Sequence, residues 1–116
     1  MRRFALLLAL AVAPAWAVSP DAQEFLDLSK KLEPVQCEKS KLRRELAVAG
    51  VQRDDAKVKE LRARFDALGR DKETARMEAR LAALEPRILD RDGKARRPED
   101  LDAISLQRRE AFYRCR

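Results

Sequence analysis

Two cysteines, Cys37 and Cys115, carry the most specific chemistry in this sequence of 116 residues. A cysteine pair can form an internal disulfide, join two chains, or act as a redox couple. The sequence holds no Cys-x-x-Cys motif and no activating arrangement beside either thiol, which disfavours the redox couple. We therefore predict a Cys37–Cys115 disulfide, with a bond between two chains as the alternative. An internal bond would close a long loop. The loss of chain entropy in the unfolded state would then stabilise the folded protein by about 4 kcal/mol.

The remaining side chains offer little catalytic chemistry. The sequence has no histidine, which is the commonest general base and transition-metal ligand. Its three glycines are isolated, so there is no Gly-rich phosphate loop. Beyond the first 18 residues the hydroxyl nucleophiles lack a triad or nucleophile-elbow setting: Ser19, Ser29, Ser40, Thr74 and Ser105. We predict no catalytic residue, no metal ligand and no cofactor, and hence no enzyme.

Many acidic residues stand four positions before a basic residue, which is the spacing of ion pairs on a helix surface. The pairs are Asp27–Lys31, Asp55–Lys59, Glu60–Arg64, Asp66–Arg70 and Glu110–Arg114. Each would add only about 0.2–0.5 kcal/mol. The acidic side chains are therefore predicted to lie on solvated helix faces rather than in a catalytic cleft.

The first 17 residues have the pattern of a secretory signal peptide. Arg2 and Arg3 precede an apolar run from Phe4 to Val12, and small residues stand at Ala15 and Ala17. Cleavage is expected after Ala17, which leaves a single domain of residues 18–116. The apolar run is shorter than the roughly 20 residues of a membrane span, so no stable membrane insertion is expected after cleavage. We predict a protein of the bacterial periplasm, or one secreted further, where disulfides persist.

The composition of residues 18–116 is typical of long helices. Ala, Leu, Arg, Glu and Lys dominate, and no run of alternating β-branched residues predicts a strand. The whole sequence has 26 basic and 20 acidic residues. Because the two signs are interspersed, the sequence lacks the clustered basic face of a nucleic-acid-binding protein. We expect no nucleic acid among its partners.

Capping residues and apolar spacing predict the helices. Ser19 and Pro20 begin a first helix that ends near Gly50, with a kink near Pro34 and with Lys39 as a polar residue in its apolar stripe. Asp54 begins a second helix with the stripe Val58, Leu61, Phe65 and Leu68, interrupted at residues 69–71. Pro98 begins a third helix with the apolar face Leu101, Ile104, Ala111, Phe112 and Cys115. These signals predict an all-α fold, an antiparallel helical hairpin or coiled coil with the third helix fixed by the disulfide.

A second apolar stripe follows the interruption at residues 69–71 and predicts an interaction surface. It consists of Met77, Leu81, Leu84 and Ile88. At 100° per residue, Leu81 points nearly opposite to Leu61, so either the chain bends near Gly69 or the two stripes face different partners. A basic cluster on the first helix is either solvated surface or a patch for an acidic protein or lipopolysaccharide. The candidate surface comprises Lys39, Lys41, Arg43, Arg44, Met77, Leu81, Leu84 and Ile88. It would receive a protein partner or a second copy of the chain in a homodimer.

Two families resemble this chain. Small helical stress chaperones of the periplasm share its size, charge and helical pattern, although their Leu-Thr-x-x-Gln repeats are absent. Cys37-x4-Leu42 near the start, and Gln107-Arg108 with Phe112 and Cys115 at the end, resemble the LprI-type lysozyme-inhibitor domain. The chain departs from that family in the spacing of the terminal helix and in lacking its further cysteines. The resemblance implies the same disulfide and a packing role for Phe112.

The functional hypothesis that follows is an exported, non-enzymatic helical protein of the bacterial envelope. It would act by protein–protein interaction, as a chaperone-like or adaptor protein. The alternative is an inhibitor of an envelope hydrolase such as lysozyme, which the second resemblance implies.

Overall fold

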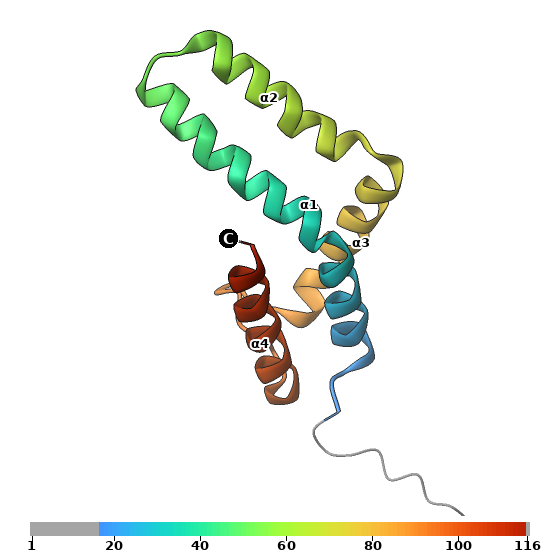
Figure 1. Ribbon diagram of the computed structural model, residues 1–116. Coiled ribbons are helices and arrows are strands. Elements are labelled where there is room, and N and C mark those ends of the chain that lie inside the picture. Colours follow the sequence, from blue (N-terminus) through green and yellow to red (C-terminus); the bar gives the residue numbers. More distant parts are fainter. Residues whose placement is uncertain (1–16, 116) are drawn as a thin grey trace, which may run out of the picture.

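The computed structural model describes residues 17–115, and the predicted signal peptide therefore lies almost entirely outside the described residues. Within residues 17–115 the elements are four helices and one isolated antiparallel bridge between Leu89 and Ala95. The helices are α1 (Pro20–Val51), α2 (Asp55–Arg70), α3 (Lys72–Ile88) and α4 (Pro98–Arg114) (Figure 1). The predicted all-α fold is confirmed. In the part of the chain that is described, no helix combines the length and apolarity needed to cross a membrane.

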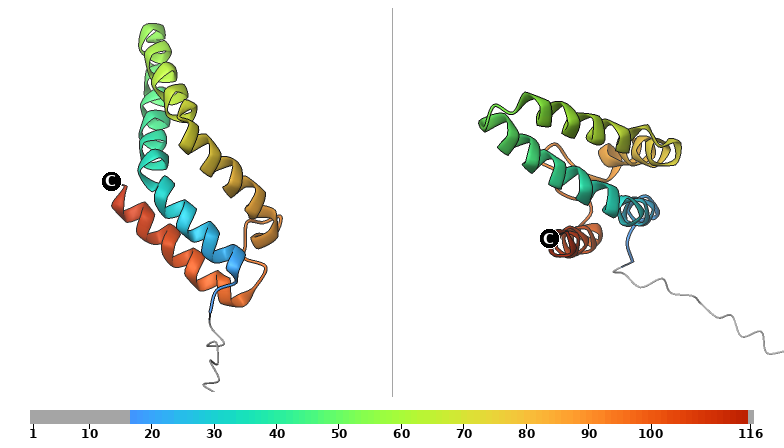
Figure 2. Two further views of the ribbon diagram at one scale, coloured as in Figure 1. Left: turned by 90° about the vertical axis from the view of Figure 1, so that its right-hand side faces the viewer. Right: turned by 45° about the horizontal axis from the view of Figure 1, so that its top comes forward.

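Helix α1 begins where its capping residue predicts. The Ser19 hydroxyl accepts a hydrogen bond from the Ala22 N–H at 3.3 Å, and Pro20 occupies the first helical turn. Pro34 lies inside α1 without breaking it. The helix axis changes direction in its middle part (Figures 1 and 2), as expected where a proline removes a donor and crowds the preceding turn.

The segment that returns along α1 consists of two helices, α2 and α3, because the chain bends at Asp71. Of the two alternatives that the sequence leaves open, the bend is therefore the one observed, but Gly69 itself is still helical and lies in the last turn of α2. Asp71 ends α2 with a non-helical backbone (φ −58°, ψ 126°) and also caps α3, accepting hydrogen bonds from the N–H and hydroxyl of Thr74. These two hydrogen bonds lower the pKa of the Asp71 carboxyl. The bend turns the apolar stripe of α3 towards α1.

The helices form two regions with separate cores. We call α2 and residues 38–51 of α1 the arm, and residues 17–37 with α3 and α4 the base. The core of the arm is Leu42, Ala49 and Leu61, and that of the base is Ala22, Phe25, Leu84, Ile88, Leu89 and Ile104. The arm is a layer of two helices, whereas α4 lies beside α1 in the base and adds a third helix (Figures 1 and 2).

A tight loop returns the chain from α3 to α4. Asp90 accepts hydrogen bonds from the N–H groups of Asp92 and Lys94, and Gly93 adopts a φ of 75° that favours glycine. Helix α4 then runs parallel to α1 and ends beside its middle (Figure 1).

Candidate functional site

The disulfide joins α1 to the end of α4. Cys37 and Cys115 are bonded, with their Cα atoms 5.4 Å apart and 78 positions apart in the sequence. The predicted internal pairing is therefore confirmed. Because Cys115 directly follows the last helical turn, the bond holds the carboxyl end of α4 against α1.

Polar side chains fix α4 at further points along its length. Near its start, the Asp100 carboxylate is 1% exposed and accepts the Ser19 N–H at 2.9 Å and the Ser19 hydroxyl at 2.8 Å. In the middle, the Gln107 amide donates to the Leu26 carbonyl at 2.7 Å. Sequence reasoning missed these contacts, because both side chains have the pattern of solvated helix residues.

An ion pair fixes the last turn of α4. The Arg114 guanidinium donates to both carboxylate oxygens of Glu33, at 2.6 and 3.1 Å. This bidentate hydrogen bond raises the pKa of Arg114 further above its ordinary value, so the guanidinium stays charged. Of the five ion pairs predicted at i, i+4, only Glu110–Arg114 forms in the described chain. The other ion pairs of the described residues each connect two different helices.

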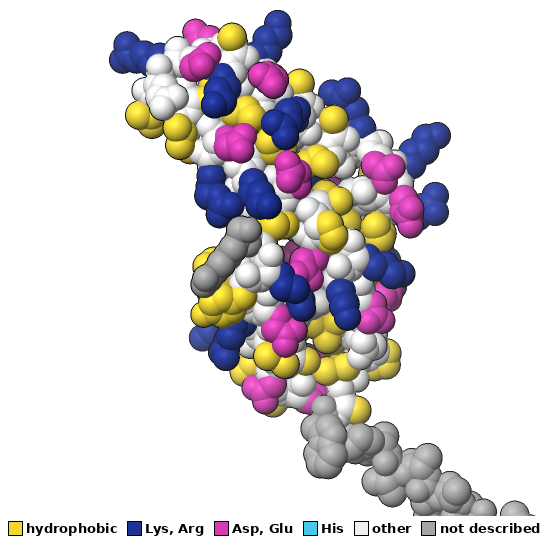
Figure 3. All heavy atoms as spheres, viewed as in Figure 1, with side chains coloured by type: hydrophobic (Ala, Val, Ile, Leu, Met, Phe, Trp, Pro, Cys, Tyr) yellow, Lys and Arg dark blue, Asp and Glu magenta, His cyan; other side chains and the backbone are white. Residues whose placement is uncertain are grey.

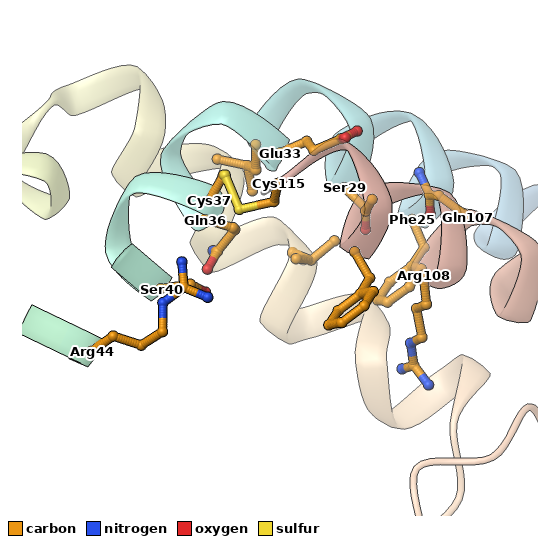
Figure 4. Close-up of a pocket in the computed structure, with 14 residues that line it drawn as sticks. Phe25, Ser29, Glu33, Gln36, Cys37, Ser40, Arg44, Gln107, Arg108 and Cys115 are labelled. Carbon is orange, nitrogen blue, oxygen red and sulfur yellow. A yellow bond between two sulfur atoms is a disulfide. The ribbon is translucent and has the colours of Figure 1, made fainter. Parts of the chain in front are cut away.

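A groove of about 430 Å³ lies between α1, α3 and α4 (Figure 4). Its walls are largely apolar, with the disulfide at one side and polar side chains along α1. The lining residues are Phe25, Ser29, Leu32, Glu33, Gln36, Cys37, Ser40, Arg44, Leu81, Gln107, Arg108, Ala111, Phe112 and Cys115. The volume is within the range of about 300–1,000 Å³ that is typical of ligand pockets.

The positive charge of the groove is uncompensated at the Arg44 end. Glu33, an acidic residue of the lining, is already paired with Arg114. Arg44 has no carboxylate within 4 Å among residues 17–115. Its side chain extends back along α1, with the guanidinium beside Ser40 (Figure 4). Arg108 donates to the Gly93 carbonyl at 3.3 Å and points away from the groove.

The outer face of α4 exposes large apolar side chains. Leu101 is 44% exposed, Leu106 54%, Phe112 70% and Tyr113 57%. The rings of Phe112 and Tyr113 are in edge-to-face contact, with centroids 5.6 Å apart. Apolar side chains gather beside the end of α4 on the face shown in Figure 3, whereas the two signs of charge are interspersed over the rest of it.

This exposure corrects the predicted apolar face of the third helix. Leu101 and Phe112 were assigned to the packed side, but the side of α4 that faces α1 carries Asp100, Ile104 and Gln107. The helix is rotated because Asp100 and Gln107 each make a hydrogen bond to the start of the chain. Phe112 therefore lines the rim of the groove and is not a core residue, contrary to the packing role that the resemblance implied.

The predicted interaction surface is divided by the fold. Leu84 and Ile88 are 0% and 2% exposed, so they are core residues and cannot face a partner. The bend at Asp71 is the reason, since it turns their stripe onto α1. Leu81 is partly buried and lines the groove together with Arg44. Met77 is half-buried, so it is neither a core residue nor fully exposed.

The rest of the predicted surface is the basic cluster of α1, which the structure also divides. Lys39 lies at the junction of three helices, where its ammonium is 2.7 Å from Glu78 on α3 and 5.7 Å from the ring centre of Phe65 on α2. Arg43 lies over the same ring at 5.3 Å. Lys41 is half-buried. Arg44 is thus the one member of the cluster that reaches the groove.

In the part of the chain that the structure describes, no group of three or more Cys, Asp or Glu side chains could hold a metal ion. Comparison with known proteins finds no matching family model, no similar curated protein and no similar solved structure.

Proposed function

We propose that this protein is an exported, non-enzymatic, protein-binding domain of the bacterial envelope that acts as an adaptor or chaperone-like protein. The observation that carries this proposal is the outer face of α4, where Leu101, Leu106, Phe112 and Tyr113 are all exposed. Large exposed apolar side chains that gather beside the end of α4 (Figure 3) are typical of an interaction surface. Aromatic side chains are enriched at the centres of such surfaces.

The way in which α4 is held supports the same proposal. The disulfide, the Asp100–Ser19 contact and the Gln107–Leu26 contact keep the inner face of α4 against α1. A fixed helix presents its outer side chains with little further loss of entropy on binding. A disulfide is also compatible with an oxidising, exported compartment, in agreement with the predicted signal peptide.

The proposal is tested by placing a photo-reactive amino acid at Leu106 in cells that export the protein. Illumination should produce one recurrent adduct, and the matched control at Arg62, an exposed residue of α2, should not produce it. An adduct between two copies of the chain would identify the homodimer as the partner. If Leu106 yields only what Arg62 yields, the outer face of α4 is not a binding surface.

A second candidate function is inhibition of an envelope hydrolase such as lysozyme. It is favoured because most of the residues that carry the resemblance to the LprI-type domain line one groove: Cys37, Gln107, Arg108, Phe112 and Cys115. Leu42 does not line it, because it is a core residue of the arm. The test is lysis of cell-wall suspensions by lysozyme with and without an excess of the oxidised protein. Inhibition is supported if the wild-type protein slows lysis and the Phe112→Ser variant does not. It is excluded if the wild-type protein leaves the rate of lysis unchanged.

A further inference from the structure

The groove is long. Its lining residues on α1 run from Phe25 to Arg44 at spacings of three, four and one along a single face. At 1.5 Å per residue this stretch is about 28 Å of helix axis. The groove is therefore long enough for an extended chain.

The walls of the groove do not suit an extended peptide. An extended peptide needs partners for its backbone N–H and C=O groups, as a sheet edge would offer. The walls here are helices, whose backbone groups are already hydrogen-bonded within α1, α3 and α4. A hydrocarbon chain has no such requirement.

The charge distribution of the groove indicates that a bound hydrocarbon chain carries an anionic head group. The apolar lining includes Phe25, Leu32, Leu81 and Phe112, whereas Arg44 stands at one end without a carboxylate partner among residues 17–115. A guanidinium binds carboxylates and phosphates through charge-assisted, often bidentate, hydrogen bonds. We propose that the groove binds a single-chain anionic amphiphile, with its acyl chain along α1 and its head group at Arg44. The groove shares Phe112 with the proposed protein-binding face, but Leu106 and Tyr113 of that face do not line the groove, so the two proposals can be tested separately.

The experiment is titration calorimetry of the oxidised protein with two probes below their micelle concentrations, myristate and monotetradecyl phosphate. At least one should bind with a stoichiometry of one. Tighter binding of myristate would identify a free fatty acid as the natural class, and tighter binding of the phosphate a lysolipid. Tetradecyltrimethylammonium is the cationic control and should bind at least about tenfold more weakly.

Two variants separate the groove from adventitious apolar binding. Arg44→Glu should weaken the binding of the anionic probe by about tenfold or more, whereas the matched control Arg62→Glu should leave it unchanged. Ser29→Trp should fill the groove and abolish binding, with an unfolding midpoint equal to that of the wild type. Absence of saturable binding of both probes, or equal binding by wild type and Arg44→Glu, would overturn the inference. Neither outcome bears on the adducts expected at Leu106.

Discussion

The arm and the base of this molecule share one helix, α1, but are stabilised differently. In the arm, α1 packs mainly against α2, and the core is limited to Leu42, Ala49 and Leu61. In the base, α1 lies between α3 and α4, and the core has twice as many buried residues together with the disulfide. Packing one helix against α1 buries a single seam, whereas packing two helices against it creates both a larger core and a groove. The candidate site therefore lies mostly in the base, with Ser40 and Arg44 of the arm at one end.

The two regions meet at the junction around Lys39. Its ammonium is bound to Glu78 and lies over the ring of Phe65, so one side chain of α1 contacts both helices that flank the bend at Asp71. A lysine in an apolar stripe is a disruption in a simple hairpin. Here Lys39 contacts an acidic partner, because the chain bends between α2 and α3 at the level of this residue. The arm is thus coupled to the base through a polar contact and through the continuity of α1.

The largest expected effect is loss of the disulfide. The double variant Cys37→Ser/Cys115→Ser should lower the free energy of unfolding by about 4 kcal/mol, because the open chain gains the entropy of a long loop. Urea denaturation followed by circular dichroism measures the change. Wild-type protein under reductant should reproduce it, and the variant should be insensitive to reductant. Equal midpoints for variant and wild type would show that the other contacts suffice to hold α4.

A pair of core truncations separates the two regions. Leu84→Ala in the base and Leu61→Ala in the arm each remove a buried side chain at a cost of roughly 3 kcal/mol. Because the base is the more stable unit, Leu84→Ala should lower the midpoint of global unfolding. Leu61→Ala should instead accelerate hydrogen exchange in α2 and residues 38–51, while the amides of α3 and α4 stay protected. If both variants accelerate exchange throughout the chain, the arm and base form one cooperative unit.

How much of this comparison the sequence predicts depends on the kind of interaction. Local rules placed the helix starts at Ser19, Asp54 and Pro98, and the two cysteines predicted the bridge between helices. Apolar periodicity failed on α4, where Leu101 and Phe112 are outside. Hydrophobic patterns carry no information on a contact such as that of Ser19 with Asp100, which are 81 positions apart.

The same limit explains the fate of the predicted interaction surface. The sequence is consistent with two orientations of the apolar stripe of α3. A bend in the chain would turn this stripe towards α1, whereas in one straight helix it would face a different partner. The choice depends on the backbone of one residue, Asp71, which turns Leu84 and Ile88 inward. The groove could not be predicted either, because its polar lining residues Ser29, Gln36 and Ser40 lie beside α4 only in the folded chain.

The Asp100 contact is expected to contribute less than the apolar core of the base. Asp100→Asn should destabilise the protein by about 2 kcal/mol, because a buried carboxylate that accepts two hydrogen bonds is replaced by a neutral amide with one oxygen. Thermal unfolding measures the loss. The matched control is Asp102→Asn, an exposed change two residues further along α4, which should have little effect. Equal effects would mean that charge in the first turn of α4 matters and burial does not.

The smallest expected effect is a dependence of the base on acidic pH. The Arg80 guanidinium of α3 donates to both carboxylate oxygens of Glu24 on α1, at 2.6 and 2.9 Å. Hydrogen bonding to Arg80 lowers the pKa of Glu24 below its ordinary value of 4.5. The unfolded chain therefore binds a proton more readily than the folded one. The stabilisation is fully present above pH 4.5 and is lost as the pH falls through the lowered pKa of the folded state.

Denaturation midpoints measured between pH 6 and pH 3 test this contribution. In Glu24→Gln the decline at acidic pH should be slightly shallower than in the wild type, because one carboxylate that favours the folded state is missing. The matched control is Glu60→Gln, which removes an exposed carboxylate of the arm that has no ion pair within 4 Å in the described chain. Its profile should parallel that of the wild type. A steeper decline in Glu24→Gln would reverse the sign of the linkage and show that Glu24 does not stabilise the contact between α1 and α3. Because this pair is exposed and lies outside both cores, even its full loss should leave the difference between arm and base intact.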